Sequence, residues 1–383
     1  MRLERYSTVS AYGIFIIFVL ALPLFVGDPF WLNRVAKYLV FGMLGVAVAL
    51  SWGYAGVLNL GQGLFFGIGA YMFAMSLKLA STTSLQQGSD TPVPDFMLWN
   101  AEPGAPTELC CITKGSFLWV PFQSQWFGVA MALAVPTVVA AALGMVIFKK
   151  RVTGVFISII MLALVLLVRL VLVDAQPLTN GFNGLTDLGW FSVGGFEFDP
   201  YITPTYYLIA VSLCVVLVLA RLLVETRGGL ILQAIRDDEK RVCFLGFDAP
   251  AYQVFFFAVS AMIAGFAGML YVLASEFASP TFLDLTFSIA MVVWAAVGGR
   301  NSLLGACVGA MLINLIEASA SETEALLQGW KAVIGLIFIL VVLYLPRGLA
   351  GLAKDVVGRI GSFALRHKER DRVPVVEPSK EAG

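Results

Sequence analysis

The run WGYAGVLNLGQGLFFGIGAY, residues 52–71, combines uncharged polar side chains with many glycines. Within it, Asn59 and Gln62 carry amide groups that can both donate and accept hydrogen bonds. Such groups suit hydrogen bonding to a small neutral solute, but they can also cap backbone groups between closely packed helices. The spacing of Gly63 and Gly67 predicts such close packing of membrane helices. The run therefore indicates a solute pathway, a tight helix contact, or both.

A second stretch, TRGGLILQAIRDDEKRVCFLGFD at residues 226–248, is much more polar than its flanks. Leu230, Ala234 and Ile235 are spaced i, i+4 and i+5, which predicts a short amphipathic helix, and Gly246 provides its stop. Mixed charges around a compact apolar stripe favour a helix that docks a partner protein, with a solvated loop as the alternative. The residues expected to contact that partner are Arg227, Ala234, Ile235, Arg236, Glu239, Leu245 and Gly246.

A third set of polar side chains follows the run AAVGGRNSLLGACVGAMLIN at residues 295–314. Asn314 and Glu317 lie one helical turn apart, and an acidic residue within an apolar segment suggests a functional role. Because Glu317 is close to the end of the segment, a solvated position fits equally well. Arg169, inside LALVLLVRLVLVD, is expected to extend its side chain to the membrane surface rather than to line a pathway. The candidate pathway residues are Trp52, Tyr54, Asn59, Gln62, Trp294, Asn314 and Glu317.

The sequence lacks the residue sets that common enzymes use. Its one histidine, His367, lies in a charged tail, so histidine metal sites and Ser-His-Asp triads are excluded. The cysteines show no paired CxxC spacing, and neither GxxxxGKS nor GxxxxGKT, the phosphate-binding loop, occurs. The formal net charge is zero, which argues against a nucleic-acid partner. We expect no catalytic residue, metal or cofactor in this chain.

The composition places the chain in a membrane. Of 383 residues, 59% are hydrophobic and only 13% are charged, with a mean hydropathy of +0.86, whereas soluble chains carry about 25% charged residues. Apolar stretches of about 20 residues, the length of a membrane-spanning helix, recur without the alternation of barrel strands. A glycine-rich turn between the second and third stretches predicts a broken or re-entrant helix. The expected fold is an all-α, polytopic bundle of about ten transmembrane helices near residues 11–27, 35–52, 58–79, 126–148, 152–173, 205–224, 251–274, 285–298, 302–318 and 330–346.

Lysine and arginine gather in alternate connections, at 149–151, 221–241, 300 and 347–372. Because positive residues concentrate on the cytoplasmic side, these connections and both termini are expected there. Residues 175–204 contain no lysine or arginine and are expected on the outer side. The predicted organisation is a transmembrane domain at 1–352, with an outer loop at 80–125 and a cytoplasmic segment at 226–248, followed by a charged, partly disordered tail at 353–383.

Several motifs occur in a fixed order: the glycine-rich run at 52–71, TNGFNGL at 179–185, AIRDDEKRVCFLGFD at 234–248, GGRNSLLGACVGA at 298–310 and LPRGLAGL at 345–352. Together they resemble the membrane subunits of bacterial ABC importers of the branched-chain amino-acid permease family, over about residues 34–352. Within that family, the run SWGYAGVLNLGQGLFFGIGAY, VWAAVGGR at 293–300 and PDFM at 94–97 look most similar to the second permease subunit of urea importers.

The resemblance implies alternating access in the bacterial inner membrane, with this chain supplying pathway and coupling but no ATPase. The implied partners are a second homologous permease subunit, two cytoplasmic ABC ATPase subunits docked on residues 226–248, and a periplasmic solute-binding protein. The implied cargo is urea or a short-chain amide, a small neutral polar solute. The same machinery importing branched-chain amino acids is the alternative, and an ATP-independent channel or secondary carrier is a further one.

Overall fold

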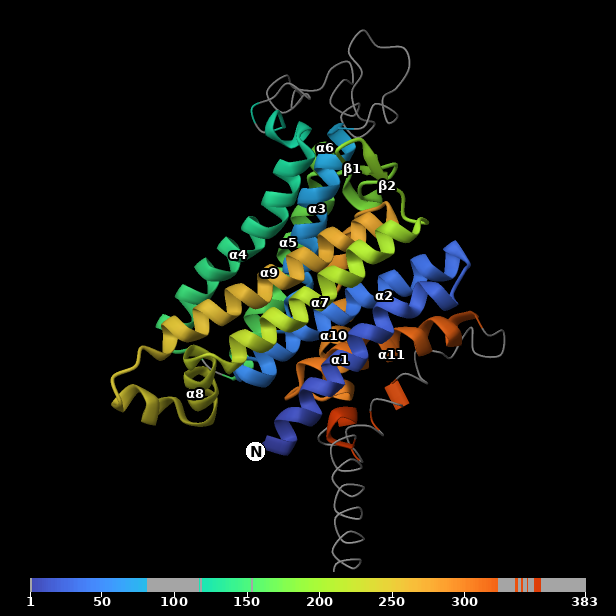
Figure 1. The fold of residues 1–383 in the computed structure, drawn as a ribbon. Helices are drawn as coiled ribbons and strands as arrows, with labels where there is room; N and C mark the ends of the chain where they lie inside the picture. The colour runs from blue at the N-terminus through green and yellow to red at the C-terminus, as the bar shows by residue number, and fades with distance from the viewer. Residues whose placement is uncertain are drawn as a thin grey trace, which may run out of the picture.

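The long helices of the chain run alongside one another, and two short strands lie at one end of the bundle (Figure 1). The computed structural model describes residues 2–80, 117, 119–152 and 154–322, with short pieces between 335 and 352. The elements are α1 (Arg2–Phe25), α2 (Pro29–Val48), η1 (Ala49–Tyr54), α3 (Gln62–Ala80), η3 (Pro121–Gln123), α4 (Gln125–Lys149), α5 (Val155–Asp174), α6 (Gln176–Thr179), η4 (Gly181–Asn183), β1 (Phe191–Val193), β2 (Phe196–Phe198), α7 (Thr203–Glu225), α8 (Arg227–Phe244), α9 (Ala249–Ser275), η5 (Pro280–Leu283), α10 (Leu285–Gly298) and α11 (Leu303–Glu322).

Seven described segments are long and apolar enough to cross a membrane: α2 with η1, α3, α4, α5, α7, α9 and α11. Two further apolar helices are shorter: the part Val9–Phe25 of α1, and the whole of α10. Their positions agree with the first nine apolar segments predicted from the sequence. The tenth segment, 330–346, falls almost wholly outside the described residues, as do the tail at 353–383 and most of the loop at 80–125. Ten spans and cytoplasmic termini therefore stay predictions.

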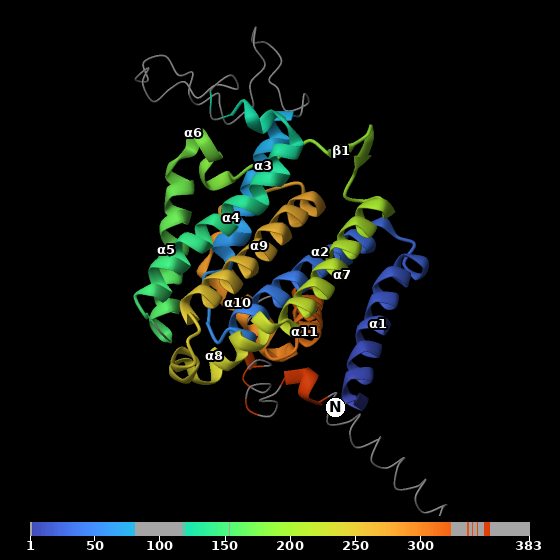
Figure 2. The same ribbon diagram turned by 60° about the vertical axis from the view of Figure 1, so that its left-hand side comes forward.

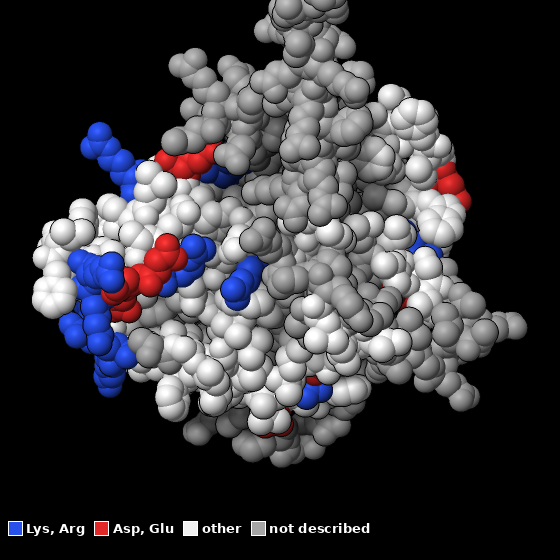
Figure 3. Space-filling view, turned by 90° about the horizontal axis from the view of Figure 1, so that it is seen from below, with Lys and Arg blue, Asp and Glu red and all other residues white. Residues whose placement is uncertain are grey.

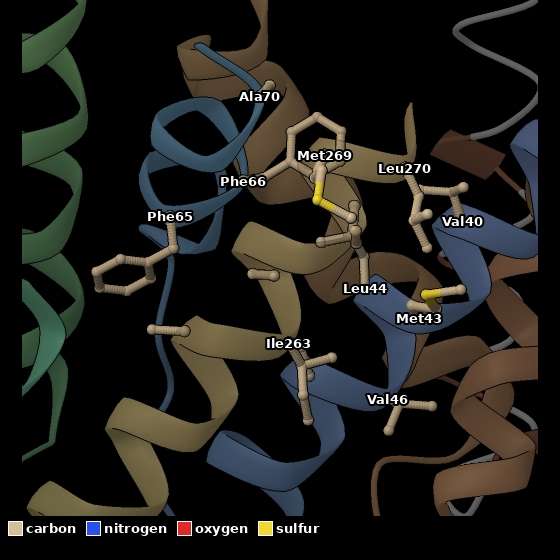
Figure 4. Packing of buried hydrophobic residues seen from close by; sticks show 14 of the residues in the cluster. Val40, Met43, Leu44, Val46, Phe65, Phe66, Ala70, Ile263, Met269 and Leu270 are labelled. Carbon is tan, nitrogen blue, oxygen red and sulfur yellow. The ribbon is translucent and has the colours of Figure 1, made fainter. Parts of the chain in front are cut away.

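The core forms where α2, α3 and α9 meet. Figure 4 shows buried side chains from these three helices gathered between them, with Leu44, Phe66 and Leu270 among those labelled. On the outside of this core, α4 packs on α9 and α3, while α11 and α7 pack on α2. Lipid tails are as apolar as leucine, so membrane helices associate closely only where small residues let their backbones approach.

Glycines provide this close approach. A Cβ atom at Gly268 of α9 would overlap the Phe66 carbonyl of α3. The close packing predicted from Gly63 and Gly67 is confirmed, because Cβ atoms there would come within 2.6 Å and 2.5 Å of side-chain atoms of α10 and η5. Larger side chains have no room at Gly268, where α9 meets α3, or at Gly63 and Gly67, where α3 meets α10 and η5.

The helix that begins with α2 does not continue into α3. Its last turn, η1, is π-helical, and residues 55–61 then leave helical geometry before Gln62 begins α3. Gly56 adopts φ +72°, a conformation that glycine accepts at no steric cost. Irregular backbone in a membrane protein is tolerated where protein buries it, and most of residues 55–61 are buried. The break predicted between the second and third apolar segments is therefore present.

The two ends of the bundle differ in charge. The start of α1, α8 and the α4–α5 turn lie at one end, called here the α8 end (Figures 1 and 2). Seen from this end, lysine and arginine gather with some acidic residues over one side of the face (Figure 3). The opposite end, called here the hairpin end, carries β1 and β2 joined by Gly194 and Gly195. Its connection at 175–204 contains no lysine or arginine, and the outer position of this end stays a prediction.

Candidate functional site

Asn59, Gln62 and Ser260 form a closed set of hydrogen bonds in the interior. Asn59 Nδ2 donates to Gln62 Oε1 at 2.6 Å, and Asn59 Oδ1 accepts from the Gly61 amide at 2.8 Å. Gln62 Nε2 donates to the carbonyl and to Oγ of Ser260, both at 3.1 Å. Ser260 Oγ in turn donates to the Ala47 carbonyl at 2.7 Å. We call these three side chains the amide cluster; it ties the irregular stretch before α3 to α2, α3 and α9.

The amide cluster is fully enclosed by protein. Asn59 is 1% exposed, and Gln62 and Ser260 are 0% exposed. A buried polar group left without a partner would cost about 1–3 kcal/mol, so mutual pairing explains how three polar side chains are accommodated in an apolar core. This geometry favours the helix-contact interpretation of Asn59 and Gln62. A solute pathway at these residues stays a prediction, and a solute there would have to displace bonds that already exist.

Trp294 belongs to an aromatic group between α2, α9 and α10. Its ring centre lies 5.2 Å from that of Phe41 and 6.0 Å from that of Phe287. Tyr271 of α9 extends the group, at 5.3 Å from Phe41. Trp294 is buried, whereas its three neighbours are half-buried. Aromatic faces of this kind can contact the apolar part of a small molecule.

Asn314 and Glu317 lie on α11, toward the end of that helix. Asn314 is 7% exposed and donates from Nδ2 to the Ala310 carbonyl of its own helix at 2.8 Å. Glu317 is half-buried. The predicted pathway residues lie in four parts of the chain: Trp52 and Tyr54 in η1, Asn59 and Gln62 in the amide cluster, Trp294 in α10, and Asn314 and Glu317 on α11.

Two basic residues in apolar helices are bound within the fold. Arg169 Nε lies 2.8 Å from Asp284 Oδ1, with the two side chains 34% and 36% exposed; the distance is that of an ion pair, although the angles are not those of a hydrogen bond. The structure pairs Arg169 with a carboxylate at the start of α10, and the extension of Arg169 to the membrane surface stays a prediction. The sequence reasoning missed Lys78, which is 1% exposed and donates to the Thr186 carbonyl at 2.7 Å. Its signal was a lysine inside the apolar run MSLKLA.

At the α8 end, η1 contacts two other segments. The Arg300 guanidinium, in the turn between α10 and α11, lies over the Trp52 ring with Cζ 5.0 Å from its centre, a cation–π arrangement. The Tyr54 hydroxyl donates to the Asn301 carbonyl in the same turn at 3.1 Å. On the other side, Arg236 of α8 donates from Nη1 to the Gly53 carbonyl. Two predicted pathway residues and one predicted docking residue therefore meet at a single place, called here the η1 junction.

The α8 segment folds as two helical pieces. Thr226 caps its start, because its Oγ1 accepts a hydrogen bond from the Gly229 amide at 3.2 Å. At Asp238 the backbone turns to φ −156° and ψ 93°, which ends the first piece. Ile235 and Val242 pack with Ala249, at the start of α9, as a small apolar cluster. The predicted short helix and its end close to Gly246 are present, but the kink was not expected.

The apolar stripe predicted for this segment is split, and the prediction is corrected. Ile235 is 2% exposed, whereas Leu230 is 59% exposed and Ala234 is also exposed. In the first piece, positions 229, 232 and 235, spaced by three, are the buried ones, and Ile235 packs with Ala249 at the start of α9. Beyond the kink, Phe244 is 91% exposed and Leu245 75% exposed. The other predicted docking residues are exposed Arg227, exposed Gly246 and half-buried Glu239.

An open apolar groove of 240 Å³ lies beside α8, between α7 and α9. It is lined by Leu223, Thr226, Gly228, Ala251, Tyr252, Phe255 and Phe256. Within the part of the chain that the structure describes, no group of histidine, cysteine and acidic side chains could hold a metal ion. The polar contacts on both sides of η1 join segments of this chain to one another.

Comparison with known proteins places these features in a transport family. The family model of the branched-chain amino acid transport system permease component matches residues 30–342. The high-affinity branched-chain amino acid transport system permease protein LivM of Escherichia coli (strain K12) is 23% identical over 370 residues, 88% of this chain and 75% of LivM. LivM of Salmonella typhimurium is 23% identical over 356 residues, 85% of this chain and 72% of the relative.

A sugar permease is also similar over part of the chain. The ribose import permease protein RbsC of Escherichia coli (strain K12) is 25% identical over 195 residues, 49% of this chain and 59% of RbsC. No solved structure is significantly similar. Because the family match takes in η1, the amide cluster and α8, the chain belongs to the family of branched-chain amino acid transport system permease components.

Proposed function

We propose that this chain is the membrane permease subunit of an ABC importer in the bacterial inner membrane, with no ATPase of its own. The carrying observation is the family match over residues 30–342, which includes a polar helical segment, α8, at one end of an apolar bundle. In this proposal two cytoplasmic ATPase subunits dock at the α8 end, a second homologous permease completes the pathway, and a periplasmic binding protein delivers solute to the hairpin end.

The exposed end of α8 supports the docking part of the proposal. Phe244 and Leu245 are large apolar side chains that are mostly exposed. Directly after them, Gly246 turns the chain with φ +88°. Exposed apolar side chains with charged neighbours, here Lys240 and Arg241, are typical of protein interfaces. We expect the ATPase to cover this tip, while Arg227 and Glu239 contribute polar contacts at its edge.

For the cargo, the relatives favour branched-chain amino acids over the urea expected from the sequence motifs. LivM, whose name gives a branched-chain amino acid system, matches most of the chain, whereas RbsC matches about half of it. Urea or a short amide remains the second candidate, because the runs at 52–71 and 293–300 resemble the urea branch. The half-buried aromatic group around Phe41 suits the apolar side chain of leucine better than it suits urea.

Uptake of labelled leucine and labelled urea should be measured in cells with an in-frame deletion of this chain, with and without the gene restored. We expect leucine uptake to fall and to return on restoration, with urea uptake unchanged. Loss of urea uptake alone would move the chain to the second candidate. If neither uptake changed, both cargo assignments would be wrong. Vesicles that hold the purified chain without ATPases should pass neither solute, and passage would favour an ATP-independent channel or carrier.

A further inference from the structure

The carbonyl of Gly53 lies where a helix ends. The last turn of η1 closes with the Ala55 amide donating to the Leu50 carbonyl at 3.2 Å and the Val57 amide donating to the Ser51 carbonyl at 2.9 Å. After that the chain leaves helical geometry, so no following turn supplies an amide to Gly53. Carbonyls in the last turn of a helix need partners from elsewhere. The guanidinium of Arg236 is the partner here, although the two residues are 183 positions apart in the chain.

Glycines let Arg236 reach this carbonyl. A Cβ atom at Gly56 would lie 2.7 Å from Cγ of Arg236, so the aliphatic part of the arginine rests on that glycine. On the opposite side of η1, a Cβ atom at Gly53 would overlap the Arg300 carbonyl. The π-helical turn is therefore held between α8 and the turn that joins α10 to α11.

Asp237 fixes the direction of the arginine. Its Oδ1 accepts from Nε of Arg236 at 3.1 Å and from Nη2 at 3.0 Å, which leaves Nη1 for the Gly53 carbonyl. The Arg236 side chain is 31% exposed, whereas that of Asp237 is 69% exposed. All three guanidinium nitrogens of Arg236 thus donate to groups of this chain.

We propose that Arg236 is a positioning residue that transmits movement of α8 to η1, rather than a contact to the ATPase. From η1 the movement reaches the α10–α11 turn through the Trp52–Arg300 contact, and it reaches α3 through the short irregular stretch that carries Asn59. This inference rests on the proposed function and divides α8 into two surfaces. The tip at Phe244 and Leu245 binds the ATPase. The surface that carries Arg236 contacts η1 and transmits the movement of α8 to it.

The direct test is hydrogen exchange of the assembled complex, in detergent, without any transported solute. We expect Arg236→Ala to raise the exchange rate of backbone amides in residues 49–57 by about tenfold, the effect of losing one charge-assisted hydrogen bond. Arg236→Lys should give a smaller rise, because a lysine keeps the charge but lacks the planar fork. Lys150→Ala, at the same end of the molecule in the α4–α5 turn, serves as the matched control and should leave the exchange unchanged. Unchanged exchange in Arg236→Ala would overturn the proposal.

The functional test uses the same variants in vesicles with the ATPases and the binding protein, and the solute that the unaltered complex carries. Arg236→Ala should keep its ATPases and hydrolyse ATP within about twofold of the unaltered complex, while solute moved per ATP falls about tenfold. Loss of the ATPases from Arg236→Ala would show that Arg236 is a docking contact and would overturn the proposal. An unaltered complex that couples no ATP to uptake would instead contradict the proposed function, and the exchange result would still decide the contact with η1.

Discussion

The α3–α9 interface and the η1 junction join their segments by different means. In the interface, backbones touch at glycines such as Gly268, and the amide cluster satisfies its polar atoms within the core. At the junction, single side chains link the segments: Arg236 binds α8 to η1, and Trp52 and Tyr54 bind η1 to the α10–α11 turn. A close-packed interface has a single geometry, because any shift opens voids or causes overlap, whereas a side-chain link can re-form after movement. The difference favours a rigid unit of α2, α3 and α9 and an α8 that moves against it.

The largest effect is expected from filling the interface. In Gly268→Val the new side chain overlaps the Phe66 carbonyl, and backbone cannot move aside without breaking α3. We expect a loss of stability of about 3 kcal/mol, seen as loss of monodisperse protein in detergent and a lower Tm. Gly13→Val is the matched control, since an added Cβ there meets nothing within 4 Å. A Gly268→Val protein as stable as this control would show that the interface is not rigid.

The sequence predicts the parts of this comparison that depend on neighbours along the chain. Apolar runs of membrane-spanning length predict the positions of the described helices. The spacing of Gly63 and Gly67 predicts the close contact of α3 with its neighbours. The partner of each polar group depends on packing between segments far apart in sequence. Nothing local pairs Gln62 with Ser260 or Arg236 with Gly53, so the sequence located these side chains without showing what they bind.

A smaller loss is expected from opening the amide cluster. Gln62→Leu removes the acceptor of Asn59 and the donor to Ser260, so polar atoms are left unpaired in the core. We expect destabilisation of about 2 kcal/mol, measured as a fall in Tm of the purified protein. The exposed Gln176 at the hairpin end offers a matched control, and Gln176→Leu should not change the Tm.

Uptake by the Gln62→Leu protein separates the two interpretations of the cluster. If the cluster serves only helix contact, uptake per folded molecule stays the same. If it lines the pathway, uptake per folded molecule falls as well, and the amide cluster would then contact the solute in addition to joining the helices.

Changes at the α8 tip should affect binding without affecting stability. Phe244 and Leu245 rest against little of the fold, so Phe244→Ala and Leu245→Ala should change the free energy of unfolding by less than about 0.5 kcal/mol. We expect the affinity for the ATPase subunits to fall about tenfold in each, as for a moderately important interface residue. Co-purification at graded ATPase concentrations measures this. Full retention of the ATPases by the double variant would place the docking surface elsewhere.

The smallest effect is expected at the edge of the rigid unit, where Arg169 of α5 pairs with Asp284 beside η5. Both side chains are about one-third exposed, so solvent screens their attraction, and exposed pairs are worth less than about 1 kcal/mol. A double-mutant cycle with Arg169→Met and Asp284→Asn, read from denaturation midpoints, measures the coupling energy between the two side chains. A coupling energy below about 1 kcal/mol means that α5 is held to the unit mainly by packing. A coupling above about 2 kcal/mol would mean that water is excluded from the pair, and α5 would then belong to the rigid unit with α2, α3 and α9.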